Sequence, residues 1–188
     1  VVVGVLMTIK KNDSVVTTYR DHGHMIARGL EPKRIMAELT GREDGYSSGK
    51  GGSMHMFSKE NNFYGGHGIV GAQVPIGTGI AFTHKYNGDK NICRTYIGDG
   101  AMNNGQVFEA FNLAALWKLP VLYIIENNKY GMGTSVERAA AGSDLYKRGE
   151  AFGIKGEIVD GMNVYSVIKA AEKAGEYVRS GKGAYILE

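Results

Sequence analysis

Runs of apolar and β-branched residues recur along the chain and predict buried strands. Residues 92–97 and 121–125 are nearly continuous runs, which is typical of parallel strands that are covered on both faces. Residues 15–19, 157–159 and 184–187 are shorter runs of the same kind. The pattern therefore predicts short strands distributed over the whole chain.

Between these runs, apolar residues recur at helical spacing. The stretch between the two longest strands carries Val107, Phe108, Phe111, Ala114 and Ala115 on one face. Further helices are predicted over residues 33–40, 72–86, 144–151 and 164–178. Alternating strands and helices indicate an α/β fold with a mostly parallel sheet flanked by helices. No repeat or linker divides the chain, so we expect residues 1–188 to form a single domain.

Two segments lack a clear period and are predicted to be loops. Residues 41–71 are rich in glycine, and residues 130–143 follow the second long strand. Long ordered loops are more often functional than not. These two loops are therefore candidate parts of a functional site.

Composition narrows the classes of function. The net charge is +3, and the 22 Lys and Arg are scattered among 19 Asp and Glu, so we expect no nucleic-acid partner. Cys93 is the single cysteine and can form no intrachain disulfide, which fits a reducing compartment. No apolar run approaches the roughly 20 residues that span a bilayer, so we expect no membrane partner.

Polar residues follow the two longest strands at the point where each ends. Asp99 lies between Gly98 and Gly100, and Asn128 follows the second strand. The carboxyl ends of parallel strands meet at one edge of a sheet, where ligands bind in open α/β folds. Carboxylate and amide oxygens suit Mg²⁺, and a helix beginning near Asn103 or Asn104 would favour a phosphate. Alternatively, Asp99 caps that helix and Asn128 is a turn residue.

Six segments together support a resemblance to a known family. They are Tyr19-Arg20 with His22-Gly23, 49–56 (Gly-Lys-Gly-Gly-Ser-Met-His-Met), 64–73 (Tyr-Gly-Gly-His-Gly-Ile-Val-Gly-Ala-Gln), Gly98-Asp99-Gly100 with the later Asn127-Asn128, 116–120 (Leu-Trp-Lys-Leu-Pro) and 127–138. The chain resembles the α subunits of thiamine diphosphate-dependent 2-oxo acid dehydrogenases of the pyruvate dehydrogenase type. The family usually has Gln where Asn104 stands.

The resemblance implies a thiamine diphosphate-binding fold with thiamine diphosphate and Mg²⁺ as cofactors. It assigns Asp99, Asn128 and the Tyr130 carbonyl to the metal. It implies cofactor contacts for Tyr19, Arg20, Ser58, Gly68, Val70, Asp99, Gly100, Ala101, Asn128, Tyr130 and Met132. Among these, Tyr19 and Arg20 would hold the diphosphate, Gly68 and Val70 the aminopyrimidine, and Met132 the bent shape of the cofactor.

The resemblance also implies an activity and partners. The activity is oxidative decarboxylation of pyruvate, with transfer of the acetyl group to the lipoyl group of an acyltransferase component. A β subunit would complete an α2β2 heterotetramer and supply the activating glutamate, so no catalytic residue is nominated in this chain.

Compared with the family, the chain reads as an internal fragment that lacks an amino-terminal region. It also lacks a His-containing loop beyond Glu188. A bacterial cytoplasm is the expected compartment, with the mitochondrial matrix as the alternative. Other activities remain open: an acetoin or another 2-oxo acid dehydrogenase α subunit, or a non-catalytic scaffold of the same fold. Ser135 matches a regulatory phosphorylation position of eukaryotic relatives and is interpreted here as an ordinary loop serine.

Overall fold

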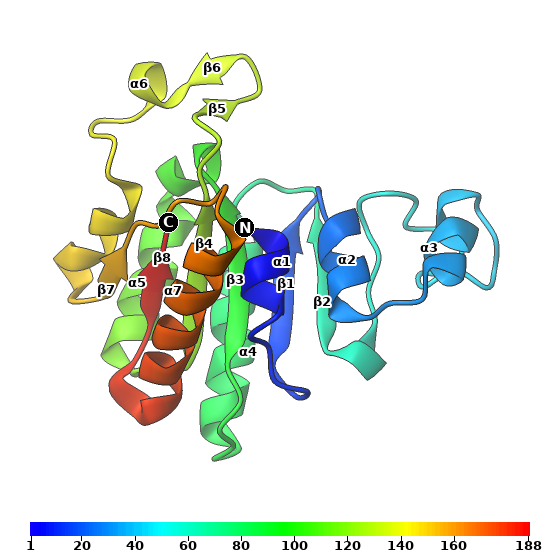
Figure 1. The fold of residues 1–188 in the computed structure, drawn as a ribbon, viewed down its shortest axis with the longest axis horizontal. Coiled ribbons are helices and arrows are strands. Elements are labelled where there is room, and N and C mark those ends of the chain that lie inside the picture. The colour runs from blue at the N-terminus through cyan, green and yellow to red at the C-terminus, as the bar shows by residue number, and fades with distance from the viewer.

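A six-stranded sheet forms the centre of the molecule in a computed structural model that describes residues 1–188 (Figure 1). Every pair of neighbouring strands in this sheet is parallel. In spatial order the strands are β2 (Phe63–His67), β1 (Ser14–Thr18), β3 (Cys93–Gly98), β4 (Val121–Glu126), β8 (Tyr185–Leu187) and β7 (Lys155–Glu157). The predicted α/β fold with a mostly parallel sheet is confirmed.

Helices cover both faces of this sheet. One face packs on α4 (Gln73–Tyr86), α5 (Gly105–Leu116) and the 3₁₀ helix η3 (Leu145–Phe152). The other packs on α1 (Val2–Leu6), α2 (His22–Arg28), α3 (Pro32–Leu39) and α7 (Val164–Tyr177), which is followed by the π-helical turn η4 (Val178–Lys182). Side chains alternate along β3, so Ile97 enters the first core and Tyr96 enters the second.

Several predicted elements are found, with small differences in their ends. The helices predicted over residues 33–40, 72–86 and 164–178 correspond to α3, α4 and α7. The helix predicted over residues 144–151 is η3, a 3₁₀ helix. The strand predicted at residues 157–159 is β7, which lies two residues earlier in the chain.

Two predicted loops contain regular structure. Residues 41–71 include the short 3₁₀ helix η1 (Lys59–Asn61) and the edge strand β2, which the sequence did not suggest because two of its five residues are glycine. Residues 130–143 contain a small hairpin of β5 (Tyr130–Gly131) and β6 (Thr134–Ser135), then α6 (Val136–Ala139). The hairpin rises above the carboxyl edge of the sheet (Figure 1).

The order of the strands places a switch point between β1 and β3. From β1 the chain passes through α2 and α3 to β2 on one side. From β2 it passes through α4 to β3 on the other side of β1. In open α/β sheets, ligands bind in the crevice that this change of direction leaves at the carboxyl ends.

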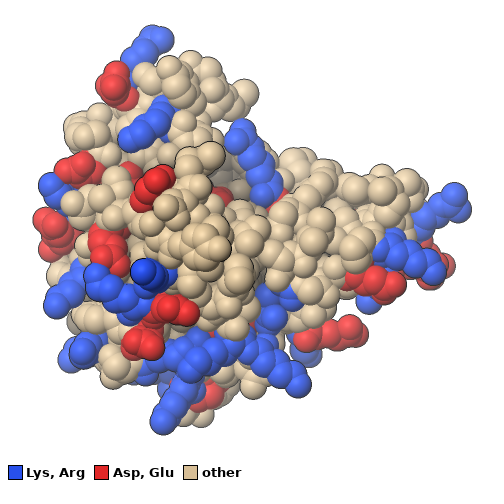
Figure 2. Space-filling model, viewed as in Figure 1, with Lys and Arg blue, Asp and Glu red and all other residues tan.

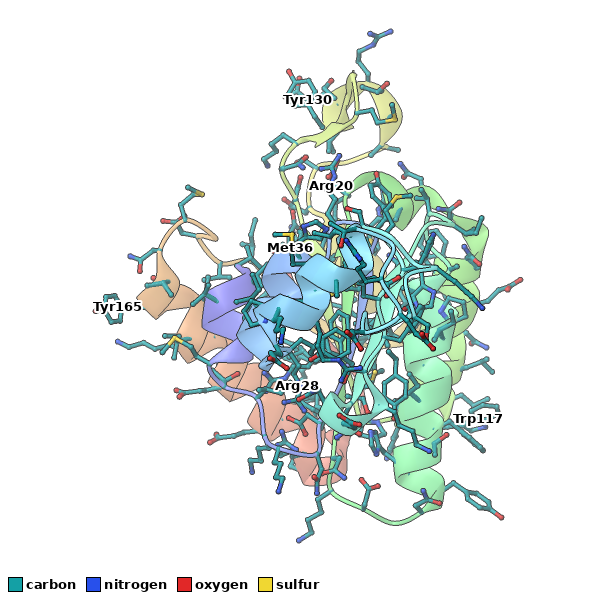
Figure 3. All side chains as sticks on the ribbon, turned by 90° about the vertical axis from the view of Figure 1, so that its right-hand side faces the viewer. Arg20, Arg28, Met36, Trp117, Tyr130 and Tyr165 are labelled. Carbon is teal, nitrogen blue, oxygen red and sulfur yellow. The ribbon has the colours of Figure 1, made fainter.

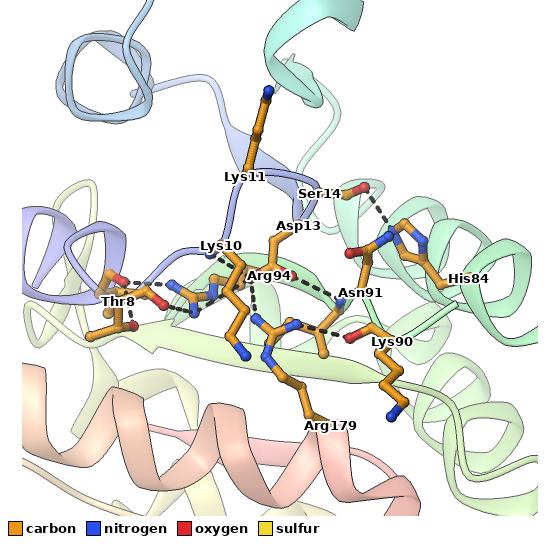
Figure 4. A network of polar contacts seen from close by, with 12 residues as sticks. Thr8, Lys10, Lys11, Asp13, Ser14, His84, Lys90, Asn91, Arg94 and Arg179 are labelled. Atoms are coloured by element: carbon orange, nitrogen blue, oxygen red, sulfur yellow. Dashed lines mark hydrogen bonds and ion pairs between the residues drawn. The ribbon is translucent and has the colours of Figure 1, made fainter. Parts of the chain in front are cut away.

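The opposite edge of the sheet holds a buried ionic network (Figure 4). Asp13, which is fully buried, accepts from the Lys10 and Ile92 amides and pairs with Arg179. Arg94 lies 3.7 Å from the same carboxylate and donates to the Val5 and Thr8 carbonyls. The network therefore fastens the first residues of the chain to β3.

The outer surface is mixed in charge. On the face shown in Figure 2, Lys and Arg are interspersed with Asp and Glu over most of the body. Uncharged surface continues from the body onto the arm that α2 and α3 form. None of the helices has both the length and the apolar character needed to cross a membrane.

Candidate functional site

A cavity of about 330 Å³ opens at the carboxyl edge of the sheet, at the switch point between β1 and β3. The segments that follow β1, β3 and β4 meet there, together with the loop before α4 and the hairpin. Its lining consists of Thr18, Tyr19, Arg20, His67, Val70, Gln73, Gly98, Asp99, Gly100, Ala101, Glu126, Asn128, Tyr130, Gly131 and Met132. Nine of the eleven residues predicted to contact a cofactor are among them, so folding brings distant motifs together.

Asp99 is the buried anion of this cavity. Its side chain is 4 % exposed, and its Oδ2 atom has no hydrogen-bond partner. It makes no capping hydrogen bond to the 3₁₀ helix η2 (Gly100–Asn103) that follows it, so the capping alternative is not what the structure shows. An unpartnered buried carboxylate is costly unless a cation compensates it, which fits a Mg²⁺ ligand.

The predicted helix start near Asn103 or Asn104 lies slightly later in the structure. Helix α5 begins at Gly105 with Asn104 as its N-cap, and η2 stands between this helix and Asp99. Gly100 and Ala101 of η2, rather than the start of α5, line the cavity. Phosphate oxygens at Asp99 would therefore meet η2 first.

Asn128 begins a turn as well as facing the cavity. Its Oδ1 atom accepts a hydrogen bond of 2.9 Å from the Tyr130 amide. Asn128 is therefore a turn residue, but this does not exclude the predicted metal ligand, because a carbonyl oxygen with two lone pairs still has one for a cation. Gly100 and Gly131 approach closely: a Cβ on either would lie 3.7 Å from the Cα of the other.

Met132 stands at the tip of the hairpin in an unusual conformation. Its φ is +56°, a left-handed value at a hairpin position that usually takes glycine, and its side chain is 87 % exposed. Such backbone strain clusters at ligand sites. A long apolar side chain held at the cavity mouth fits the predicted contact with a cofactor.

Tyr19 and Arg20 form another wall. The Arg20 guanidinium lies 5.6 Å from the centre of the Tyr19 ring. Figure 3 shows Arg20 beneath the hairpin that carries Tyr130. A planar guanidinium in a cavity that also holds the Asp99 carboxylate suits a ligand that brings both a cation and phosphate oxygens.

Two predicted contacts are not part of the lining. Gly68 lies between the lining residues His67 and Val70, and a Cβ on it would lie 3.1 Å from the His55 ring. Ser58 pairs with Phe63 at the amino end of β2, the end of that strand away from the cavity. The structure does not bring Ser58 to the site.

The lining contains a carboxyl group that the sequence reasoning did not select. Glu126 ends β4 beside Gly98 of β3, and its Oε1 atom lies 3.7 Å from Nε2 of His24. Burial raises the pKa of Glu126 to about 7, and burial lowers the pKa of His24 to about 4. The position of Glu126, two residues before Asn128 at a predicted strand end, was the signal that would have found it.

Gln73 and His67 were also not selected. Gln73 donates from Nε2 to the Tyr96 carbonyl at 3.2 Å, and its Oε1 atom has no partner. A ring nitrogen of His67 lies 3.0 Å from the Tyr64 carbonyl, and burial lowers the pKa of this histidine. The Gln73 contact joins α4 to β3, so spacing along the chain gave no signal for it. The His67 contact is local and lies within β2, a strand that the sequence did not suggest.

Comparison with known proteins identifies the relatives of the chain. The family model described as "Dehydrogenase E1 component" matches residues 1–188. The pyruvate dehydrogenase E1 component subunit alpha of Rhizobium meliloti is 62 % identical over 188 residues, covering 100 % of this chain and 54 % of the relative. That of Rickettsia felis is 61 % identical, covering 100 % and 58 %.

A eukaryotic relative is also similar. The somatic, mitochondrial form from Pan troglodytes is 58 % identical over 186 residues, covering 99 % of this chain and 47 % of the relative. The chain thus spans about half the length of the curated relatives that it matches.

A solved structure supports the fold. The neighbour is a putative thiamin diphosphate-dependent enzyme from Mycobacterium smegmatis, with a TM-score of 0.63 and 19 % identity. The match covers 98 % of this chain and 30 % of that one. The family model and the curated relatives confirm the family resemblance drawn from the sequence motifs.

Proposed function

The chain belongs to the dehydrogenase E1 component family, and on that basis we propose that it is part of a pyruvate dehydrogenase α subunit that binds Mg²⁺-thiamine diphosphate. The whole of residues 1–188 is proposed to be one cofactor-binding domain. The relatives named above all carry the pyruvate dehydrogenase name, which favours pyruvate over acetoin or another 2-oxo acid.

One observation carries the proposal. Asp99 and Asn128, from two neighbouring strand ends, line the same cavity as Arg20, and the Asp99 carboxylate is buried with an unpartnered oxygen. This donor set offers hard oxygens to a divalent cation and a guanidinium to a phosphate. Tyr130 is proposed as the third metal ligand through its carbonyl.

The residues that line the cavity are proposed to have the following roles. When bound, thiamine diphosphate supplies the electron sink for decarboxylation of a 2-oxo acid. Tyr19 and Arg20 hold the diphosphate, Gly100 and Ala101 bring the backbone close to it, and Met132 supports the cofactor from the hairpin. Val70 lines the cavity and is proposed to meet the rings of the cofactor. Gly68 is proposed to reach the ring through its backbone, as the resemblance implies.

The exposure of side chains at the cavity mouth supports the proposal that a partner subunit covers them. Val70, Tyr130 and Met132 are all more than half exposed. We propose that a β subunit covers them in an α2β2 heterotetramer and supplies the activating glutamate. The acetyl group would pass to the lipoyl group of an acyltransferase component. The bacterial relatives favour the cytoplasm as the compartment.

An activity assay on the full-length α chain with its β subunit tests the proposed substrate. The complex is given thiamine diphosphate, Mg²⁺ and an artificial electron acceptor, with pyruvate, acetoin or a branched-chain 2-oxo acid as substrate. Pyruvate should give the highest kcat/KM. Turnover of acetoin in preference to pyruvate would overturn the substrate assignment.

A further inference from the structure

Two amide side chains at the start of α5 converge on one backbone carbonyl of the cavity wall. Asn104 Nδ2 and Gln106 Nε2 each donate to the Val70 carbonyl oxygen, at 3.3 Å. A carbonyl oxygen has two lone pairs, so these two donors satisfy both. The Val70 carbonyl is therefore already fully engaged before any ligand arrives.

The residue that follows Val70 makes room for this arrangement. Gly71 has a φ of +89°, and a Cβ on it would lie 2.8 Å from Asn104 Nδ2 and 2.8 Å from Gln106 Nε2. The two amides thus fill the space that a side chain at position 71 would need. Glycine here serves both the backbone turn and the approach of the amides.

The paired donors fix what Val70 can offer to a ligand. They hold the peptide that joins Val70 to Gly71, while the Val70 side chain, 51 % exposed, lines the cavity. The Val70 amide N–H has no partner among the backbone hydrogen bonds. This loop can accordingly present a donor and an apolar side chain, but its Val70 carbonyl has no free lone pair.

Asn104 and Gln106 also lie close in sequence to the metal side of the cavity. Asp99, Gly100 and Ala101 line it, and the chain reaches Asn104 directly after η2. The segment from Asp99 to Gln106 therefore contributes to the part of the cavity proposed to bind the diphosphate, and it also holds the loop that contains Val70. A shift of the loop would change the ring end without touching Asp99.

We propose that Asn104 and Gln106 are positioning residues that hold the Val70 loop in the shape required by the ring end of thiamine diphosphate. This inference rests on the proposed function and extends it to residues outside the cavity lining. The recognised ring group must then be a hydrogen-bond acceptor or an apolar edge where it meets Val70.

Binding of two ligands of different length distinguishes this positioning role from a general loss of the cavity structure. In the full-length α–β complex with Mg²⁺, Kd is measured by calorimetry for thiamine diphosphate and for inorganic pyrophosphate, which lacks the rings. The double variant Asn104→Ala/Gln106→Met should bind thiamine diphosphate about tenfold more weakly. Its affinity for pyrophosphate should stay within about twofold, because the diphosphate end is unchanged.

Asn112→Ala is the matched control, since this exposed amide lies on the same helix and makes no side-chain hydrogen bond. The control should bind both ligands as the wild type does. Equal loss of both ligands in the double variant would show collapse of the whole cavity and overturn the proposal. Unchanged thiamine diphosphate affinity would overturn it as well. If the folded wild-type complex bound pyrophosphate but not thiamine diphosphate, the proposed function itself would fail, and the positioning role of Asn104 and Gln106 would fail with it.

Discussion

Individual side chains around the cavity are arranged at a cost to stability. Asp99 keeps a buried oxygen without a partner, and Met132 adopts a left-handed backbone conformation while its side chain faces solvent. Neither arrangement stabilises the isolated chain. Under the proposed function, a cation would compensate the Asp99 carboxylate and the bound cofactor would cover the Met132 side chain.

Met132 allows a test that separates binding from stability. Met132→Ala should change the free energy of unfolding by less than about 0.5 kcal/mol, because the side chain makes little contact. It should weaken thiamine diphosphate binding about tenfold, since a buried Met contact in the complex is lost. Met162→Ala is the control, as Met162 is 95 % exposed and lies outside the cavity. Equal affinities in the two variants would refute the contact.

Glu38 shows the opposite case of a buried carboxylate that is fully satisfied. It accepts hydrogen bonds from the backbone amides of Ser47, Gly49, Gly51 and Gly52. Burial alone would raise the pKa of Glu38, but these four donors lower it below its usual value. The glycine-rich loop is therefore built around this side chain.

Replacing this carboxylate should destabilise the protein in a pH-dependent way. A lowered pKa means that Glu38 contributes stability above about pH 4.3, the unfolded value, and that this is lost as the pH falls through the folded pKa. Glu38→Gln should cost at least about 2 kcal/mol at pH 7, since an amide cannot accept from all four donors. In urea unfolding between pH 3 and 7, the free energies of unfolding of the wild type and of Glu38→Gln should converge at the acid end. Glu43→Gln, which changes an exposed neighbour, is the control. If the free energy of unfolding of Glu38→Gln stayed below that of the wild type by the same amount at every pH, the mechanism would be contradicted.

Among the elements, periodic ones were predictable and aperiodic ones were not. Strands β3 and β4 and helix α5 follow from their apolar patterns, and Asp99 and Asn128 follow from the strand ends. Strand β2 was missed because pairing along the sheet edge, rather than β-branched side chains, holds its glycines in place. Gln73 and the paired donors to Val70 depend on contacts between distant segments, which spacing cannot reveal. Glu126, in contrast, could have been found from its place at the end of β4.

The ionic network of Asp13, Arg94 and Arg179, at the edge of the sheet opposite the cavity, should be the electrostatic contact with the largest effect on stability. Asp13→Asn leaves Arg94, which is 1 % exposed, without its buried counter-charge. Removal of one partner of a buried pair costs about 3–5 kcal/mol, and we expect a loss of that size in chemical denaturation. Asp144→Asn breaks the exposed pair with Lys147 and should leave the denaturation midpoint unchanged. Similar small shifts in both variants would mean that the network carries little of the stability.

As a whole, the molecule places its site at an edge that it does not close. The cavity lies at the switch point between β1 and β3, and the hairpin above it exposes Tyr130 and Met132. The chain spans about half the length of the curated relatives that it matches, and the proposed site includes the full α chain and a β subunit. Binding is therefore best measured on that complex.

Calorimetric titration of thiamine diphosphate into the full-length α–β complex, with and without Mg²⁺, tests the assignment of the cavity most directly. We expect tight binding that requires Mg²⁺ and falls at least about 100-fold in Asp99→Ala. The variant should remain folded, because the replaced carboxylate oxygen has no partner within the chain. Absence of binding by the folded wild-type complex, or equal binding by Asp99→Ala, would contradict the cofactor site.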